Sequence, residues 1–223
     1  GMQAAMSLRQ DGLTGNITLI GEEPGLPYQR PPLSKAYMAD GIADRLILRP
    51  TSFFERSKID YRDGVRVTQI DRERKSVTLS DGENITYAHL ILATGAANWA
   101  PPIAGINAPG VFQLRTLEDA TALRNKMAST KRAVVIGGGF IGLEFAAMAR
   151  DAGVEVTVVE AGPRLMARAI SPAMSRWFLD LHHSQGTKII LGTAASSVRV
   201  DDAGEANGVI LSDGTVIDGS LVL

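Results

Sequence analysis

A glycine-rich turn carries the clearest chemical signal in the sequence. Residues 137–142 read Gly-Gly-Gly-Phe-Ile-Gly, which fits the pattern G-x-G-x-x-G, and they follow the apolar run 133–136. Between a strand and a helix, such glycines allow a tight turn, close approach of a pyrophosphate, and close packing of the helix on the strand. The helix N-terminus then attracts the phosphates through its free N–H groups. The pattern predicts an NAD site made by Gly137, Gly139, Phe140, Ile141 and Gly142.

An acidic residue after the next apolar run strengthens this interpretation. Residues 154–159 predict a strand, and Glu160 follows them directly. A carboxylate at this position accepts hydrogen bonds from the adenosine ribose of NAD, and it repels the 2′-phosphate of NADP. We therefore predict that NADH binds in preference to NADPH. Arg164 leaves an alternative open, because its guanidinium could bind a phosphate or form a surface salt bridge.

The elements that must position these residues form a strand–helix–strand unit. Residues 140–152 predict a helix that packs through residues such as Phe145, and Gly153 is expected to end it. With strands at 133–136 and 154–159, the order is that of the βαβ unit that binds dinucleotides.

A second, similar module precedes this unit. The strand–turn–strand pattern of residues 65–82, with Asp-Gly in its turn, recurs at residues 198–214. The apolar run 17–20 leads to Glu22, just as the later strand leads to Glu160. The same elements recur in the same order. We therefore predict an α/β fold with two Rossmann-like dinucleotide-binding modules, each with an inserted β-hairpin or meander.

Paired prolines mark the expected boundary between the modules. Pro101 and Pro102 favour an extended backbone and cannot continue a helix. We predict one domain at residues 1–102 and a second at residues 103–223.

The first module is expected to be incomplete. A βαβ unit begins with a strand and a glycine turn, and neither precedes the helix predicted at residues 3–10. Gly1 is then either the last glycine of such a turn or a residue added before the start methionine. Residues 221–223 resemble the opening of a strand, so we expect the natural chain to continue beyond both ends.

The composition argues against several other classes of function. A formal net charge of -1 gives no electrostatic reason to expect nucleic acid or an anionic membrane as a partner. No apolar run approaches the roughly 18 residues that span a bilayer, and we expect a cytoplasmic protein. The chain has no cysteine, so it supplies no disulfide and no thiol redox relay. Its three histidines lack the spacing of metal ligands, and we predict no metal site.

Three further stretches carry a resemblance to a known family. They are Leu-Pro-Tyr-Gln-Arg-Pro-Pro-Leu-Ser-Lys at 26–35, Ala-Thr-Gly at 93–95, and Leu-Arg-Thr-Leu-Glu-Asp-Ala at 114–120. With the glycine turn, they resemble the FAD-dependent ferredoxin reductases of bacterial oxygenase systems, such as the putidaredoxin, rubredoxin and biphenyl-dioxygenase types. These reductases are part of the pyridine nucleotide-disulfide oxidoreductase superfamily. The resemblance covers essentially the whole chain.

The resemblance implies that residues 1–102 form a partial FAD-binding domain and that the NAD-binding domain follows. Glu22 would hold the adenosine ribose of FAD, and Val67 would meet the adenine through its backbone. Arg30 and Arg115 would direct guanidinium groups at pyrophosphate or flavin oxygens. A strand predicted at 90–92 would end close to the cofactor. The implied FAD contacts are Glu22, Arg30, Lys35, Val67, Ala93, Thr94, Gly95 and Arg115.

Two charged residues have counterparts that pair beside the flavin in the similar family. Lys35 and Glu144 are therefore expected to form an ion pair where hydride arrives from nicotinamide, and they are the catalytic residues that the resemblance implies. The alternative is a surface lysine and an unrelated glutamate on a helix face.

The resemblance implies an enzyme in which NADH reduces FAD and the flavin passes single electrons to a ferredoxin or rubredoxin. Without cysteine, the chain cannot work as those relatives do that pass electrons through a reactive thiol. Two alternatives stay open: a truncated NAD-binding module without FAD or activity, and a redox protein similar to the apoptosis-inducing factors. We expect these 223 residues by themselves to hold FAD weakly or not at all.

Overall fold

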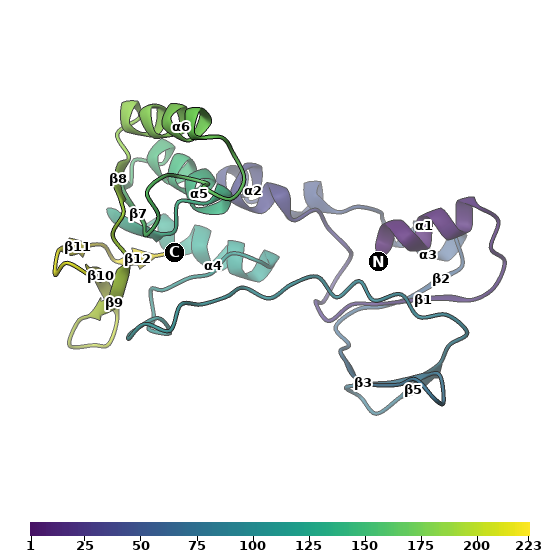
Figure 1. Cartoon of the computed structure of the whole chain (residues 1–223). Helices are drawn as coiled ribbons and strands as arrows, with labels where there is room; N and C mark the ends of the chain where they lie inside the picture. The colour runs from purple at the N-terminus through teal and green to yellow at the C-terminus, as the bar shows by residue number, and fades with distance from the viewer. The chain divides into compact units, whose positions relative to one another are not determined.

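The computed structural model describes residues 1–223, which form two compact units (Figure 1). The first unit contains residues 1–29 and 44–96, and the second contains residues 30–43 and 97–223. The domains predicted at 1–102 and 103–223 concern the binding of two cofactors, and they stay a prediction. The elements of the first unit are α1 (Met2–Gln10), β1 (Ile17–Ile20), α3 (Thr51–Arg56), β2 (Ile59–Arg62), β3 (Val67–Asp71), β4 (Ser76–Leu79) and β5 (Asn84–Thr86).

The second unit contains most of the helices. Its early segment forms a short 3-10 helix, η1 (Pro31–Ser34), and α2 (Ala36–Asp40), and a further 3-10 helix, η2 (Ala43–Leu46), leads back into the first unit. The remaining elements are α4 (Leu117–Met127), β6 (Arg132–Ile136), α5 (Phe140–Asp151), β7 (Glu155–Glu160), α6 (Pro172–Ser184), β8 (Lys188–Leu191), β9 (Ala195–Val200), β10 (Ala206–Leu211), β11 (Val216–Asp218) and β12 (Leu221–Val222).

A four-stranded parallel sheet is the centre of the second unit. Its strand order is β12-β6-β7-β8, and all three neighbouring pairs are parallel. Helix α5 packs on β6 and β7, and α6 packs on β8. The predicted βαβ unit is therefore confirmed, because β6, α5 and β7 follow one another and the two strands pair in parallel.

Helix α5 packs on this sheet through an apolar face. Its buried residues include Phe145, Ala146 and Ala149, whose spacing places them on one side of a helix. The helix ends at Asp151, and Gly153 follows with a φ of +83°, a conformation that favours glycine after a helix. Glycine thus ends the helix as predicted.

Each unit contains a three-stranded antiparallel meander, as the internal repeat predicts. The strand orders are β3-β4-β5 and β11-β10-β9. In both, Asp-Gly turns the chain between the second and third strands: the N–H of Gly82 donates to Leu79, and that of Gly214 donates to Leu211, each at 3.0 Å. The second meander shares a core with β6 and β12, made by Val134, Val198, Val209, Leu211 and Val222 among others.

The first unit has a smaller core. Strands β1 and β2 pair in parallel, with Ile17 opposite Ile59. Helix α1 contributes Met2 and Ala5 to a cluster that also contains Phe54. The predicted helix at 3–10 and the predicted strand before Glu22 are both confirmed.

The strand predicted at residues 90–92 is wrong. Leu90, Ile91 and Leu92 lie outside every strand, and their side chains are 40%, 59% and 66% exposed. A strand needs the N–H and C=O groups of a neighbour, and no other strand of the chain pairs with this run. The apolar pattern of residues 90–92 is typical of a strand, but the pattern carries no information on which strand would pair with them.

None of the helices combines the length and the apolar character that crossing a membrane would require.

Phe145 provides a test of how α5 is held on the sheet, since its side chain is 0% exposed. Phe145→Ala is expected to lower the free energy of unfolding by about 3–5 kcal/mol, because it leaves a cavity in the core. The chain has two tryptophans, Trp99 and Trp177, and both belong to the second unit. Denaturant unfolding followed by tryptophan fluorescence therefore reports on this unit.

The matched control is Leu181→Ala, which truncates a side chain on α6 that is 38% exposed. It should cost less than about 1 kcal/mol, as partly exposed positions usually do. Equal losses in the two variants would show that α5 is not packed as described.

Candidate functional site

The glycine turn between β6 and α5 combines one crowded position with one open position. A Cβ atom on Gly142 would strike the carbonyl oxygen of Gly137 and would lie 2.9 Å from Cγ1 of Val135. A Cβ atom on Gly139 would meet nothing within 4 Å. Gly142 therefore allows α5 to approach β6, while the backbone at Gly139 borders open space that a ligand can fill.

The N-terminus of α5 has no side-chain cap. Its N-cap residue is Gly139, and no side chain bonds to the first turn. By contrast, Thr116 and Asp119 form a capping box on α4, and Ser171 caps α6. The first N–H groups of α5 are therefore available to an anion, and they lie at the end of the helix with the positive partial charge.

Glu160 faces this turn from the end of β7. Its Oε2 accepts a hydrogen bond from the N–H of Gly138 at 2.7 Å, and its Oε1 accepts one from the N–H of Gly162, also at 2.7 Å. A carboxylate has about four acceptor sites, so each oxygen can accept a further bond. The role of Gly138 as a donor to Glu160 was not predicted, because the sequence pattern treats that position as variable.

The side chain of Arg164 forms hydrogen bonds with the loop that follows β7 and with the start of α6. Its Nη1 donates to the carbonyl oxygen of Ile170 at 2.8 Å and to Oγ of Ser175 at 2.9 Å, and its Nη2 donates to the carbonyl oxygen of Ala167 at 2.6 Å. Ser175 is buried and in turn donates to Leu165 at 2.6 Å. The guanidinium holds the loop between β7 and α6 together. No salt bridge is among these contacts, and the alternative of a phosphate ligand stays a prediction.

Lys35 and Glu144 lie together within the second unit. Nζ of Lys35 is 2.9 Å from Oε1 of Glu144, and the two side chains are 52% and 28% exposed. Lys35 stands between η1 and α2, and Glu144 lies in the first turns of α5. Ser34, which the sequence reasoning did not identify, donates from Oγ to Oε2 of Glu144 at 2.5 Å. Its only sequence signal is its place beside Lys35.

The residues implied for FAD are divided between the two units. In the first unit, Glu22 follows β1 and its Oε1 accepts a bond from Arg66 at 3.0 Å, while Val67 opens β3. Residues 93–95 are exposed and lie outside any strand. The second unit holds Lys35 and two arginines. In that unit, Nη1 of Arg30 donates to the carbonyl oxygen of Arg115 at 2.5 Å.

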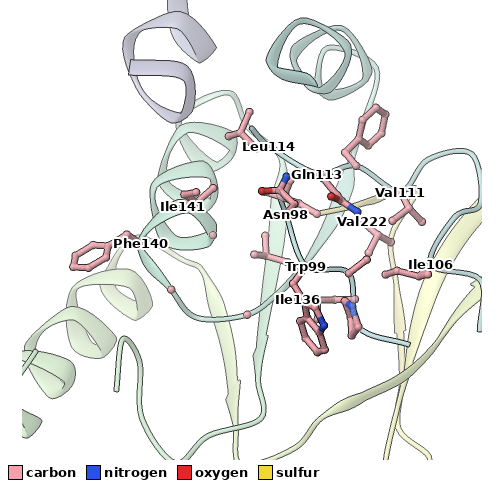
Figure 2. Close-up of a pocket in the computed structure, with 18 residues that line it drawn as sticks. Asn98, Trp99, Ile106, Val111, Gln113, Leu114, Ile136, Phe140, Ile141 and Val222 are labelled. Atoms are coloured by element: carbon pink, nitrogen blue, oxygen red, sulfur yellow. The ribbon is translucent and has the colours of Figure 1, made fainter. Parts of the chain in front are cut away.

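A pocket of about 510 Å³ lies beside the glycine turn, at the carboxyl ends of β6 and β12 (Figure 2). Figure 2 shows Phe140 and Ile141 on α5 at one side of this pocket and Trp99 and Val222 further along its wall. The side chains of Phe140 and Ile141 are 51% and 49% exposed, so two adjacent large apolar residues are only half buried at the start of α5. The carboxyl edge of a parallel sheet is the usual position of a ligand site in this class of fold.

No group of three or more His, Asp or Glu side chains in the chain is arranged to hold a metal ion. His182 is buried on α6, and this burial, with a smaller contribution from His183, lowers its pKa. This environment favours the neutral form of the imidazole.

Comparisons with known proteins agree with this geometry. Rhodocoxin reductase from Rhodococcus erythropolis is 49% identical over 224 residues, which cover 100% of this chain and 52% of that protein. The crystal structure of the ferredoxin reductase for the CYP199A2 system of Rhodopseudomonas palustris matches with a TM-score of 0.96 and 44% identity, over 99% of this chain and 55% of that one. The covalent putidaredoxin reductase–putidaredoxin complex matches with a TM-score of 0.95 and 37% identity, over 100% and 54%. The chain thus spans about half the length of the relatives it matches.

A family model described as pyridine nucleotide-disulphide oxidoreductase matches residues 1–223, the whole chain. The two structural matches cover both compact units of the chain. The chain belongs to the pyridine nucleotide-disulphide oxidoreductase family.

Proposed function

We propose that this chain is part of an NADH-dependent flavoprotein oxidoreductase that passes electrons from NADH through FAD to a small iron–sulfur protein of the ferredoxin or rubredoxin type. The observation that carries the proposal is the ion pair that Lys35 forms with Glu144, a residue of the helix that begins at the glycine turn. The names of the matched reductases and the complex with putidaredoxin support the acceptor class. The cytoplasmic location expected from the sequence is part of this proposal.

The residues around the turn fit NAD(H). The backbone at Gly139 borders open space, and the first N–H groups of α5 have no side-chain cap, so both are suited to a pyrophosphate. Glu160 would accept hydrogen bonds from the adenosine ribose while its two bonds to backbone N–H groups keep it oriented. Phe140 and Ile141 would give the nucleotide an apolar wall.

Other residues of the chain fit FAD. Glu22 is exposed just beyond β1, a position similar to that of Glu160 at the end of β7. We assign the ribose of the FAD adenosine to Glu22, the adenine to the backbone of Val67, and close backbone passage to Ala93, Thr94 and Gly95. Arg30 and Arg115 would supply donors to pyrophosphate or flavin oxygens.

The bound cofactors would supply the redox chemistry, in which hydride passes from nicotinamide to flavin and electrons leave the flavin one at a time. The side chains of the protein would hold the cofactors in position and provide charged groups beside them. Glu144 and Lys35, whose side chains lie 2.9 Å apart, would place the nicotinamide. This chemistry needs no nucleophile from the chain, and no thiol is present to carry electrons, since the chain contains no cysteine.

We expect this chain to bind NADH at least about tenfold more tightly than NADPH, a difference of about 1.4 kcal/mol. The carboxylate of Glu160 repels a 2′-phosphate, and Arg164 already donates to two carbonyl oxygens of its own loop and to Oγ of Ser175 on α6. Isothermal titration calorimetry with both nucleotides measures the ratio.

Glu160→Ala should reduce this preference, whereas Glu155→Ala should leave it unchanged. Glu155 is a matched control because it is an exposed glutamate at the other end of the same strand, β7. Equal affinities for the two nucleotides in the unaltered chain would show that Glu160 does not face the ribose.

Glu144→Ala is expected to slow the reduction of bound FAD by NADH, in the FAD-bound protein that contains this chain, by on the order of 100-fold. The reason is that a small misplacement of the reacting atoms is costly, while the adenosine contacts of Glu160 remain. The affinity for NADH should therefore change much less than the rate. Stopped-flow absorbance of the flavin at increasing NADH concentrations separates the limiting rate from the dissociation constant.

Asp151→Ala provides the control, because Asp151 is an exposed carboxylate at the far end of the same helix. Its limiting rate should match that of the unaltered protein. An unchanged limiting rate in Glu144→Ala would return Glu144 to a role on the helix surface only.

A further inference from the structure

Ser34 is a buried polar residue next to the proposed catalytic pair. Its side chain is 5% exposed, and it is the last residue of η1. Its Oγ lies 2.5 Å from Oε2 of Glu144, a residue 110 positions away in sequence, and 3.5 Å from the carbonyl oxygen of Pro31. The short bond to Glu144 is therefore its main interaction, and it is of the charge-assisted kind that a carboxylate accepts from a hydroxyl.

Both oxygens of the Glu144 carboxylate are held by consecutive residues. Oε1 faces Nζ of Lys35 at 2.9 Å, and Oε2 accepts from Ser34. The terminal torsion of a glutamate side chain has broad, roughly two-fold preferences, so a carboxylate with one partner can turn about it. With two donors, the Glu144 carboxylate cannot turn without breaking one of the bonds.

The ion pair alone is poorly suited to fix the carboxylate. The Lys35 side chain is 52% exposed, and its Nζ also lies 3.3 Å from the carbonyl oxygen of Pro31. An ion pair of this exposure is screened by water and costs side-chain entropy to hold. The hydroxyl of Ser34 has neither problem, because it is buried and its side chain has a single rotatable bond to order.

The segment around Ser34 is rigid enough for this role. Pro31 and Pro32 restrict the backbone of η1, and the N–H of Lys35 donates to the carbonyl oxygen of Pro32 at 3.0 Å. On either side of Ser34, Leu33 is 2% exposed and Met38 is 1% exposed. The backbone that carries the hydroxyl is thus anchored by buried side chains in the same unit as α5.

We propose that Ser34 is a positioning residue, whose hydroxyl holds the Glu144 carboxylate in the orientation in which it pairs with Lys35 and receives the nicotinamide. This proposal rests on the proposed function of that pair. Ser34 would affect the rate only through its bond to Glu144, and not by contact with the reacting atoms.

The first test needs no cofactor. In the 223-residue chain with ¹³C-labelled glutamate carboxyl groups, the resonance of Glu144 is identified by its loss in Glu144→Gln. Ser34→Ala should move this resonance, and Ser34→Thr, which keeps the hydroxyl, should return it toward its original position. Ser184→Ala should leave it in place, because Ser184 is an exposed serine on α6 of the same unit. An unmoved resonance in Ser34→Ala overturns the proposal.

The second test uses the FAD-bound protein. Ser34→Ala should lower the limiting rate of flavin reduction about tenfold, less than the loss of the whole carboxylate, with little change in the dissociation constant of NADH. Ser34→Thr should recover most of the rate. In a Glu144→Ala background, Ser34→Ala should cause no further loss, because residues that act through one another are not additive.

The outcomes separate this proposal from the proposed function. A full additional loss in the double variant, or an unchanged rate in Ser34→Ala, overturns the positioning role even if the resonance moves. Tryptophan fluorescence unfolding of each variant shows that it is folded, so a lost rate is not mistaken for a lost structure. Failure of the proposed function has a different signature, since NADH would then not reduce the flavin even in the unaltered protein.

Discussion

The close approach of α5 to the end of β6 is the constraint on which the rest of the site depends. Gly142 permits it, because any side chain there would strike the carbonyl oxygen of Gly137. The approach fixes where α5 begins, and therefore where its free N–H groups point. Glu144 then lies in the first turns of this helix, near the glycine turn. The approach also brings the turn against the end of β7, where Glu160 bonds to its backbone.

The second unit gathers parts of the site that are distant in sequence. Residues 30–43 interrupt the first unit in sequence but pack with the second, through η1 and α2 against α5. Lys35 and Ser34 therefore reach Glu144 within one compact unit. The geometry of this charged cluster is set by local packing of a proline-stiffened segment on a helix.

The features that could be predicted from the sequence are those set by neighbours in the chain. The glycine turn, the Asp-Gly turns and the acid that ends β7 each depend on a few adjacent residues, and the structure has them all. Contacts made across the fold could not be predicted in this way. Leu92 and its neighbours have a strand composition, yet no strand pairs with them. Arg164 is satisfied by three oxygen atoms that only the folded loop brings together, and Ser34 meets Glu144 across 110 residues.

The missing side-chain cap on α5 affects the stability of the folded protein. On α4 and α6, the chain itself satisfies the first N–H groups, and such caps are worth about 1 kcal/mol each. On α5 that contribution is left to whatever anion binds there. A nucleotide bound only by the folded form adds RT ln(1 + [L]/Kd) to stability, about 2.7 kcal/mol when its concentration is 100 times Kd. A nucleotide bound there would be a structural component of the helix end, and its supply in the cell would help to set how long the folded chain resists unfolding and proteolysis.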